Sequence, residues 1–369
     1  MYYKQYGNTG LKVSAIGLGT MRYDEEDIKA GRLEKCAEIP LYAFEKGINY
    51  FDMAPSEKAP FAAYAAAFAG RREQILTQMH FGAIYKGGKY GWTRKLDDIK
   101  EQFDWELKLL DTSYTDMGFI HCIDDQEDLE GVMDGGLWDY MKALKAEGKI
   151  RHLGFSSHNP DIARRILDTG LVDMMMFSIN PAYDYRQGEY AIGEVAERAA
   201  LYRECESMGV GISVMKPFAG GQLLSAKTSL FKRPLSHTQC IQYALDRPAV
   251  LTVLPGIRNV EDLQTVLRYV AATPAEKDYS VVGEFTPRDA DGVCVYCNHC
   301  QPCPKGLDVG LINKYYDLAL AGDEMAAGHY AKLPVRAEAC VKCGHCESRC
   351  PFHVKQEARM VEIQTYFAK

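Results

Sequence analysis

Short apolar runs alternate with longer amphipathic segments along most of the chain. Eight apolar runs predict β-strands at residues 13–18, 48–51, 75–77, 117–120, 152–155, 174–179, 211–214 and 251–254. The segments between them predict helices at residues 27–46, 96–109, 137–147, 160–169, 190–208, 236–245 and 260–270, and Asn159 and Asn259 are positioned to cap two of these. Eight strand–helix units over roughly 260 residues match a (β/α)8 TIM barrel, and we expect this α/β fold.

A doubly wound nucleotide-binding fold is the alternative. That fold carries G-x-G-x-x-G after its first strand, whereas this chain has Gly17-Leu18-Gly19-Thr20-Met21-Arg22 and lacks the third glycine, which permits close helix packing. The phosphate-binding sequence G-x-x-x-x-G-K-[ST] does not occur, so nothing indicates a nucleoside triphosphatase. The barrel is therefore the better interpretation.

Polar side chains follow nearly every predicted strand. In a (β/α)8 barrel the loops after the strands form the open mouth, where catalytic residues lie. The candidates at these positions are Asp52, Glu57, His80, His121, Ser156, Ser157, His158, Ser178, Asn180, Lys216 and Arg258. A single polar residue at a strand end is ordinary loop chemistry, but this repetition indicates a functional mouth.

The composition is that of a soluble globular protein. Of 369 residues, 47% are hydrophobic and 25% are charged. No apolar stretch reaches the length of about 18 residues that a membrane span needs, and the N-terminal residues lack the apolar run of a signal peptide. We therefore expect a cytoplasmic protein. The formal net charge of −7 disfavours nucleic acid as a partner, because proteins that bind it usually carry a basic surface.

Eight of the 12 cysteines crowd into the stretch from Cys294 to Cys350. They form two runs, C-x2-C-x2-C-x2-C-P and C-x2-C-x2-C-x3-C-P. Three thiolates at this spacing can grip one [4Fe–4S] cluster, and in two-cluster ferredoxins the fourth cysteine ligates the other cluster. The spacing predicts one cluster on Cys294, Cys297, Cys300 and Cys350, and a second on Cys340, Cys343, Cys346 and Cys303.

The first run departs from the bacterial pattern, because two residues rather than three separate Cys300 from Cys303. A pair of structural zinc ribbons is the alternative, although zinc needs only two C-x2-C pairs for each site. Residues 309–320, between the runs, predict a helix. The expected domains are a barrel of residues 1–282 and a small helical, ferredoxin-like iron–sulfur domain of residues 283–369.

The sequence resembles the aldo-keto reductase superfamily, specifically its bacterial branch with a C-terminal ferredoxin-type domain. The resemblance covers essentially the whole chain. It rests on YGNTGLKVS at 6–14, GINYFD at 47–52, YTD at 114–116 leading to Ile120-His121, GKIR at 148–151 leading to GFS at 154–156, and Pro255-Gly256.

This resemblance implies hydride transfer between NADP(H) and a carbonyl group, with an Asp, Tyr, Lys and His tetrad in the barrel mouth. In the family the tyrosine protonates the carbonyl oxygen, the lysine and aspartate depress its pKa, and the histidine orients the substrate. Asp52 matches the family aspartate and His121 the family histidine. Glu57 stands at the tyrosine position, and His80 stands at the lysine position, with Met79 as the alternative alignment.

The positions that the family uses for its cofactor also differ. Family members commonly place Asn after the Ser of strand five, Gln on strand six and a stacking Tyr on strand seven. Here Ser157 follows Ser156, and the other two positions hold Ser178 and Met215. Arg258 could meet the 2′-phosphate of NADP(H) as a charged fork.

Three functional hypotheses follow. The first is a reductase in which Glu57 donates the proton with His80 or His121 assisting, while the clusters pass single electrons to a ferredoxin or flavoprotein partner. The second is an isomerase, epimerase or lyase in which Asp52, Glu57, His80 and His121 hold a divalent metal and Lys216 anchors an anionic substrate group. The third is an electron-transfer protein whose barrel has lost catalysis. The substrate in the first two is a small molecule.

Overall fold

The computed structural model describes residues 1–5, 7–55, 58–184, 191–284, 292, 294, 300–320, 326–350 and 353–368. The chain divides into two compact units. Unit 1 comprises Met1–Ile179, Ala196–Pro217 and His237–Lys277, and unit 2 comprises Asn180–Val195, Phe218–Ser236 and Asp278–Lys369. Unit 2 therefore takes in two segments from within the stretch expected to form the barrel, and the boundary after residue 282 stays a prediction.

Eight parallel strands form the main sheet of unit 1, and neighbours in the sheet follow one another along the chain. They are β3 (Leu18–Gly19), β4 (Tyr50–Met53), β5 (Leu76–Phe81), β8 (Thr115–Ile120), β9 (Ile150–Ser157), β10 (Met174–Ser178), β11 (Gly211–Met215) and β12 (Val250–Val253). Ile16, just before β3, forms a parallel bridge with Val253 of β12, and the Gly17 amide donates to the Val253 carbonyl at 3.0 Å. The sheet thus curls so that its two edges approach each other. The structure confirms an α/β fold of eight parallel strands, consistent with the expected (β/α)8 barrel.

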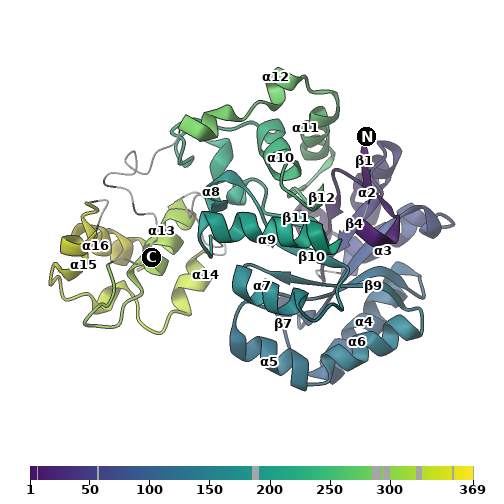
Figure 1. Cartoon of the computed structure of the whole chain (residues 1–369), viewed down its shortest axis with the longest axis horizontal. Coiled ribbons are helices and arrows are strands. Elements are labelled where there is room, and N and C mark those ends of the chain that lie inside the picture. The colour runs from purple at the N-terminus through teal and green to yellow at the C-terminus, as the bar shows by residue number, and fades with distance from the viewer. Residues whose placement is uncertain are drawn as a thin grey trace. The chain divides into compact units, whose positions relative to one another are not determined.

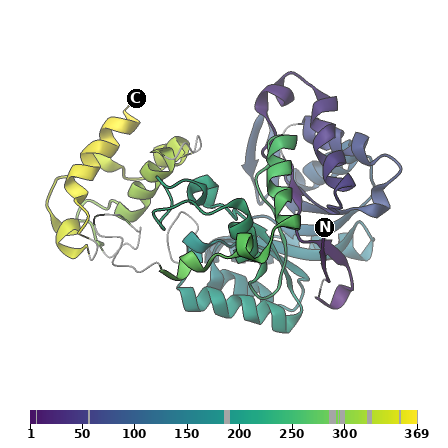
Figure 2. The same cartoon turned by 90° about the horizontal axis from the view of Figure 1, so that it is seen from above.

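Helices follow the strands, as Figures 1 and 2 show. Asn159 and Asn259 cap α7 and α11 as expected, because each side chain accepts a hydrogen bond at 3.0 Å from a backbone amide of the first turn. The helices up to Lys277 are α1 (Glu25–Lys29), α2 (Leu33–Glu45), α3 (Lys58–Phe68), α4 (Leu96–Leu110), α5 (Gln126–Asp134), α6 (Leu137–Ala146), α7 (Pro160–Leu167), α8 (Pro181–Asp184), α9 (Val195–Met208), α10 (His237–Leu245), α11 (Val260–Ala271) and α12 (Pro274–Lys277).

Several elements differ from the expected pattern. The helix expected at 27–46 is broken into α1 and α2 at Gly31, whose φ of +63° a helix does not adopt. The strand expected at 13–18 is divided, because β2 (Lys12–Ser14) pairs antiparallel with β1 (Tyr3–Gln5), and the barrel strand begins at Leu18. An unexpected hairpin, β6 (Ala83–Lys86) and β7 (Lys89–Trp92), follows β5. Its turn is Gly87-Gly88, both with positive φ, which suits a two-residue hairpin loop.

The inside of the barrel is a packed apolar core below the mouth. It contains Val13, Tyr50, Met117, Phe119, Met174, Met176, Leu251 and Leu254. Gly154 on β9 makes room for this packing, since a Cβ atom built there would lie 2.4 Å from Cε1 of Phe119 and 2.8 Å from the Met174 carbonyl oxygen. Position 154 therefore tolerates no side chain without movement of the backbone or of Phe119.

We expect Gly154→Ala to lower the free energy of unfolding by about 2–3 kcal/mol, because the added methyl group overpacks a rigid core. The matched control is Gly131→Ala in α5, where a Cβ meets nothing within 4 Å. This change should raise stability by about 0.5–1 kcal/mol, since alanine favours a helix. Urea unfolding of both variants measures the difference, and equal effects would contradict the packing argument.

Unit 2 has its own helices and core. Its elements after α8 are η3 (Ala219–Leu224), η4 (Ser280–Glu284), α13 (Val309–Leu320), α14 (Ala326–Ala331), η6 (Ala337–Ala339), α15 (His345–Arg349) and α16 (Gln356–Phe367). The helix expected at 309–320 is confirmed as α13, which lies beside α16 (Figure 2). Ile312, Tyr330 and Ile363 are fully or almost fully buried in this core. Within the described ranges, no helix is long and apolar enough to cross a lipid bilayer.

Candidate active site

Asp52, His80 and His121 lie together at the carboxyl ends of three neighbouring strands. Asp52 is on β4 and opposite Gln78 on β5, and His80 lies two residues further along β5, so it projects to the same side of the sheet. His80 Nε2 lies 2.6 Å from Asp52 Oδ1, and Gln78 Nε2 donates to the same oxygen at 2.8 Å. His121, the residue after β8, places its Nδ1 3.3 Å from His80 Nδ1. The sequence predicted this group, and the structure brings it together.

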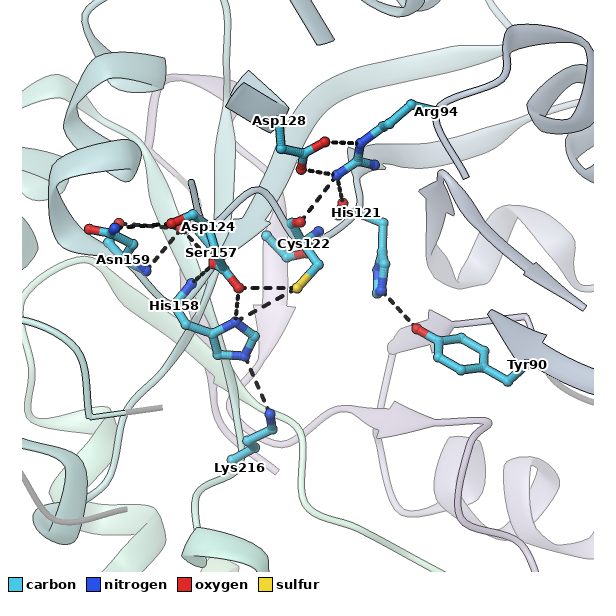
Figure 3. Close-up of polar contacts among 11 residues, drawn as sticks. Tyr90, Arg94, His121, Cys122, Asp124, Asp128, Ser157, His158, Asn159 and Lys216 are labelled. Atoms are coloured by element: carbon cyan, nitrogen blue, oxygen red, sulfur yellow. Dashed lines mark hydrogen bonds and ion pairs between the residues drawn. The ribbon is translucent and has the colours of Figure 1, made fainter. Parts of the chain in front are cut away.

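Tyr90 extends this group and was not among the expected residues. It lies on β7 of the hairpin, and its hydroxyl is 2.7 Å from His121 Nε2 (Figure 3). Four side chains from four strand segments therefore form one continuous line, Asp52–His80–His121–Tyr90.

Burial keeps His121 and Tyr90 electrically neutral. Burial, together with the neighbouring His80 and Arg94, holds the pKa of His121 well below its usual value. Burial also raises the pKa of Tyr90, with smaller contributions from Cys122 and Asp52. Both ring nitrogens of His80 and of His121 already have partners within this line. A metal ion at these histidines would have to displace those contacts, so the geometry disfavours the metal-dependent hypothesis.

A second polar group lies at the ends of β8, β9 and β11 (Figure 3). His158 Nδ1 is 2.8 Å from Asp124 Oδ2, and Cys122 Sγ donates to the same oxygen at 3.3 Å. Lys216 Nζ lies 3.3 Å from His158 Nε2. Cys122 and Lys216 have φ of +49° and +56°, a left-handed conformation that is unfavourable for residues other than glycine. Such strain at two strand ends is typical of functional positions.

Cys122, Asp124 and His158 offer three metal-ligand atoms within 4.8 Å of one another. Thiolate, carboxylate and imidazole together would suit zinc. The Lys216 ammonium donates to His158 Nε2, however, so the imidazole proton lies on Nδ1 and is donated to Asp124. That proton occupies the nitrogen a metal would need. The contacts therefore favour a hydrogen-bonded group over a metal site.

Acid should destabilise the protein through His158. Burial and the Lys216 charge lower the pKa of His158 to about 4, although Asp124 opposes this shift. The unfolded chain takes up a proton near pH 6.5, whereas folded His158 stays neutral until near pH 4, so lowering the pH between these values favours unfolding.

We expect the wild-type protein to lose up to about 3 kcal/mol of stability through this group between pH 6.5 and 4. His158→Gln removes the titration while it keeps a polar side chain, and its stability should fall less steeply over the same window. Urea unfolding at a series of pH values measures both slopes. Identical slopes would show that His158 does not titrate in this way.

The expected cofactor residues are only partly available. Ser157 Oγ donates to Asp124 at 3.2 Å, and Ser156 Oγ accepts the Cys122 amide at 2.7 Å. Ser178 Oγ is buried and has no hydrogen-bond partner among the described residues. Arg258 forms a two-pronged contact with Asp262 at 2.8 and 3.2 Å. Ser178 is thus a donor without a partner at the mouth, which fits a missing polar ligand group.

Four of the described tail cysteines line a cavity in unit 2. Its lining includes Cys303, Cys340, Cys343 and Cys346, the set expected for the second cluster. Cys300 is nearly buried in the core of this unit, and Cys294 Sγ accepts a hydrogen bond from Gln356 Nε2 at 3.8 Å. Two expected site residues, Glu57 and Cys297, lie outside the described residues.

Met215 ends β11 and Lys216 follows it. Lys216 joins a polar group, which is that of His158 rather than that of Asp52. Sequence reasoning missed Asp124 and Tyr90. The repeated acidic pair Asp124-Asp125 after His121 was a signal for the first, and the Gly87-Gly88 turn was a signal for the hairpin that carries the second.

Known proteins share this fold and sequence pattern. The model of the aldo/keto reductase family matches residues 15–239, which is more than half of the chain. The uncharacterized oxidoreductase YqkF of Bacillus subtilis is 27% identical over 312 residues, covering 78% of this chain and 97% of the relative. L-galactose dehydrogenase of Arabidopsis thaliana is 26% identical over 293 residues, covering 70% of this chain and 84% of the relative.

A crystal structure of an aldo-keto reductase from Klebsiella pneumoniae in complex with NADPH superposes with a TM-score of 0.55 at 19% identity, covering 77% of this chain and 94% of that one. This likeness bears on the fold alone. With the matched family model, the barrel and the polar residues at its mouth lead to one conclusion: this chain is an oxidoreductase that belongs to the aldo/keto reductase family.

Proposed function

We propose that the barrel interconverts a carbonyl group and an alcohol with NAD(P)H, through an acid–base set built on Asp52, His80 and His121. The observation that carries the proposal is the contact of Asp52 with His80 at 2.6 Å and of His80 with His121 at 3.3 Å, at the mouth of the barrel. His80 stands where the family places a lysine next to this aspartate. His80 therefore gives the Asp52 carboxylate an imidazole as its hydrogen-bond partner, in place of the lysine of the family.

Asp52 orients the set. Its Oδ1 accepts from both Gln78 Nε2 and His80 Nε2, so His80 carries its proton on Nε2 and presents Nδ1 as an acceptor toward His121. The Asp52 side chain is 14% exposed and that of His80 is 2% exposed, so these hydrogen bonds are largely shielded from water. Shielding from water strengthens the hydrogen bonds between Asp52, Gln78 and His80. Their donor–acceptor order sets the direction in which a proton can move. Glu57 remains the sequence-based candidate for the group that exchanges a proton with the substrate.

NAD(P)H supplies or receives the hydride when it is bound. Ser156, Ser157 and Ser178 are the candidates for its carboxamide, and the unpartnered Ser178 Oγ supports this fit. Arg258 is the candidate for a 2′-phosphate. It already faces the Asp262 carboxylate, which lowers the attraction for that phosphate, so NADH and NADPH both need to be tested.

The tail, in this proposal, holds two [4Fe–4S] clusters and passes single electrons between the barrel and a ferredoxin or flavoprotein. The C-x2-C-x2-C spacing and the shared cavity of Cys303, Cys340, Cys343 and Cys346 support the second cluster. Four thiolates around one cavity could also bind a zinc ion. Metal analysis of the purified protein distinguishes a zinc site from an iron–sulfur cluster. A nicotinamide cofactor transfers two electrons at once as hydride. An iron–sulfur cluster would be needed to pass electrons on one at a time.

The test is a survey of NADH and NADPH oxidation by the iron-loaded protein, without oxygen, with small aldehydes, ketones and α-dicarbonyls. The reverse reaction is followed with the corresponding alcohols and oxidised cofactor. We expect turnover with at least one pair. Absence of both cofactor binding and turnover across the survey would overturn the proposal.

A further inference from the structure

Tyr90 is delivered to the barrel mouth by the β6–β7 hairpin. Phe81 at the end of β5 pairs with Ala83 of β6, and the chain returns along β7 with Tyr90 directly opposite Tyr85. The hairpin thus brings a phenol to within 2.7 Å of His121 Nε2 (Figure 3). The tyrosine position at residue 57 is filled by glutamate, so this phenol comes from a different part of the fold.

The hydrogen bonds along this line all run in one direction. Asp52 is the terminal acceptor, so His80 donates from Nε2 and accepts at Nδ1. His121 therefore donates from Nδ1 and accepts at Nε2. The remaining member, Tyr90, must donate its hydroxyl proton to His121 Nε2. Each tautomer is fixed by the one before it, starting from the buried carboxylate.

We propose that Tyr90 is the catalytic residue that exchanges a proton with the substrate oxygen, and that His121 and His80 relay this proton to Asp52. The inference rests on the proposed function. It assigns to the β6–β7 hairpin the role that the resemblance places at residue 57.

In the direction of alcohol oxidation, the substrate hydroxyl gives its proton to the Tyr90 oxygen. Tyr90 passes its own proton to His121 Nε2, His121 passes its Nδ1 proton to His80, and His80 passes its Nε2 proton to Asp52. The C–H bond of the alcohol breaks, its electron pair leaves as hydride to the oxidised nicotinamide cofactor, and the carbonyl forms. Carbonyl reduction is the reverse and begins with a proton on Asp52. Protons and electrons balance in both directions.

Burial along the line supports this order. Asp52 and His80 are largely buried, whereas Tyr90 is half-buried, and Trp92, two residues further along β7, is 61% exposed. The line therefore leads from the barrel interior to the outside, and Tyr90 is the member next to solvent. Burial raises the pKa of Tyr90, so the phenol is protonated at neutral pH and can donate a hydrogen bond to His121 Nε2.

The first test needs no substrate. Nitrogen-15 NMR of imidazole-labelled protein reports which nitrogen of each histidine carries the proton. We expect a proton on Nε2 of His80 and on Nδ1 of His121, and a shift of the His121 Nε2 resonance in Tyr90→Phe. A proton on Nε2 of His121 in the wild-type protein would overturn the relay, whatever the protein catalyses.

The second test compares Tyr90→Phe with Tyr114→Phe in NADPH-linked reduction of 4-nitrobenzaldehyde. Tyr114 precedes β8 at the other end of the strand that leads to His121, so it is the matched loss of a phenol hydroxyl. Tyr90→Phe should lower kcat by about 10²–10⁴-fold with little change in KM, and Tyr114→Phe should match the wild type. A Tyr90→Phe variant that is folded and fully active overturns the proposal.

Two further outcomes separate this inference from the proposed function. Suppose that the wild type turns over, that Tyr90→Phe is active and that Glu57→Gln is inactive. The proposed function then stands, and the catalytic role proposed for Tyr90 is wrong. If the tautomers are as expected but the wild type neither binds nor oxidises NADH or NADPH, the proposed function fails, and the catalytic role of Tyr90 fails with it. A solvent deuterium isotope effect on kcat that disappears in Tyr90→Phe supports the relay.

Discussion

Asp52→Asn is expected to lower kcat for NAD(P)H-linked turnover by about 10²–10⁴-fold. An asparagine oxygen can still accept from Gln78 Nε2 and His80 Nε2, so the geometry at β4 and β5 should survive. The amide cannot take up a proton, however, so a proton relay that ends on Asp52 is interrupted. The loss should therefore appear in kcat far more than in the free energy of unfolding.

Asp27→Asn is the matched control for Asp52→Asn. Asp27 lies in α1 and pairs with Arg32 near the surface, and neither residue is at the ends of β4, β5 or β8. Its activity should equal that of the wild type, since a surface ion pair contributes about 0–1 kcal/mol to stability. Steady-state kinetics and urea unfolding of both variants decide the matter. An active Asp52→Asn protein would mean that the carboxylate serves only to hold the fold together.

If the tail holds the two proposed [4Fe–4S] clusters, Cys346→Ala is expected to halve the bound iron, from about eight to about four atoms per chain. Cys346 belongs to the C-x2-C-x2-C part of the second run and lines the same cavity as Cys340 and Cys343. A cube held by three thiolates instead of four loses iron more readily, while the other cluster keeps its ligands. Cys303→Ala should damage the same cluster, although Cys303 lies in the first run.

Cys240→Ala is the control, because Cys240 is buried in α10 and far in sequence from both runs. It should keep the iron content of the wild type. Iron and zinc analysis of protein purified without oxygen, together with the visible absorbance band, gives the result. If the wild-type protein contained about two zinc atoms and no iron, the tail would hold zinc ribbons instead of iron–sulfur clusters.

Much of the barrel could be predicted from the sequence because its signals are local. Each buried parallel strand appears as an apolar run, and each helix as a repeat of apolar positions. Eight barrel strands were expected, and the described residues contain eight successive parallel strands besides the β1–β2 and β6–β7 pairs. The failures are local as well. Gly31 breaks a helix that the periodicity continues, and the first apolar run is shared between the β1–β2 hairpin and the barrel strand β3.

The site could be predicted only where strand ends supply it. Asp52 and His80 lie near the carboxyl ends of β4 and β5, and His121 directly follows β8; the barrel brings such ends together. Tyr90 comes from a hairpin after β5, so its approach to His121 depends on a turn geometry that the apolar pattern does not contain. Likewise, Ser157 was expected to face a cofactor, but it donates to Asp124, a residue that a linear pattern could not pair with it.

Titration of the iron-loaded protein with NADPH, without oxygen and without substrate, tests whether the barrel uses the cofactor and whether its electrons reach the tail. It follows the near-ultraviolet absorbance of the dihydronicotinamide and the broad visible band of the clusters together. If the proposed function holds, we expect the nicotinamide absorbance to be lost while the visible band bleaches, because hydride taken up by the barrel would reach the proposed clusters as single electrons. NADPH that neither binds nor reacts, with the visible band unchanged, would contradict the account.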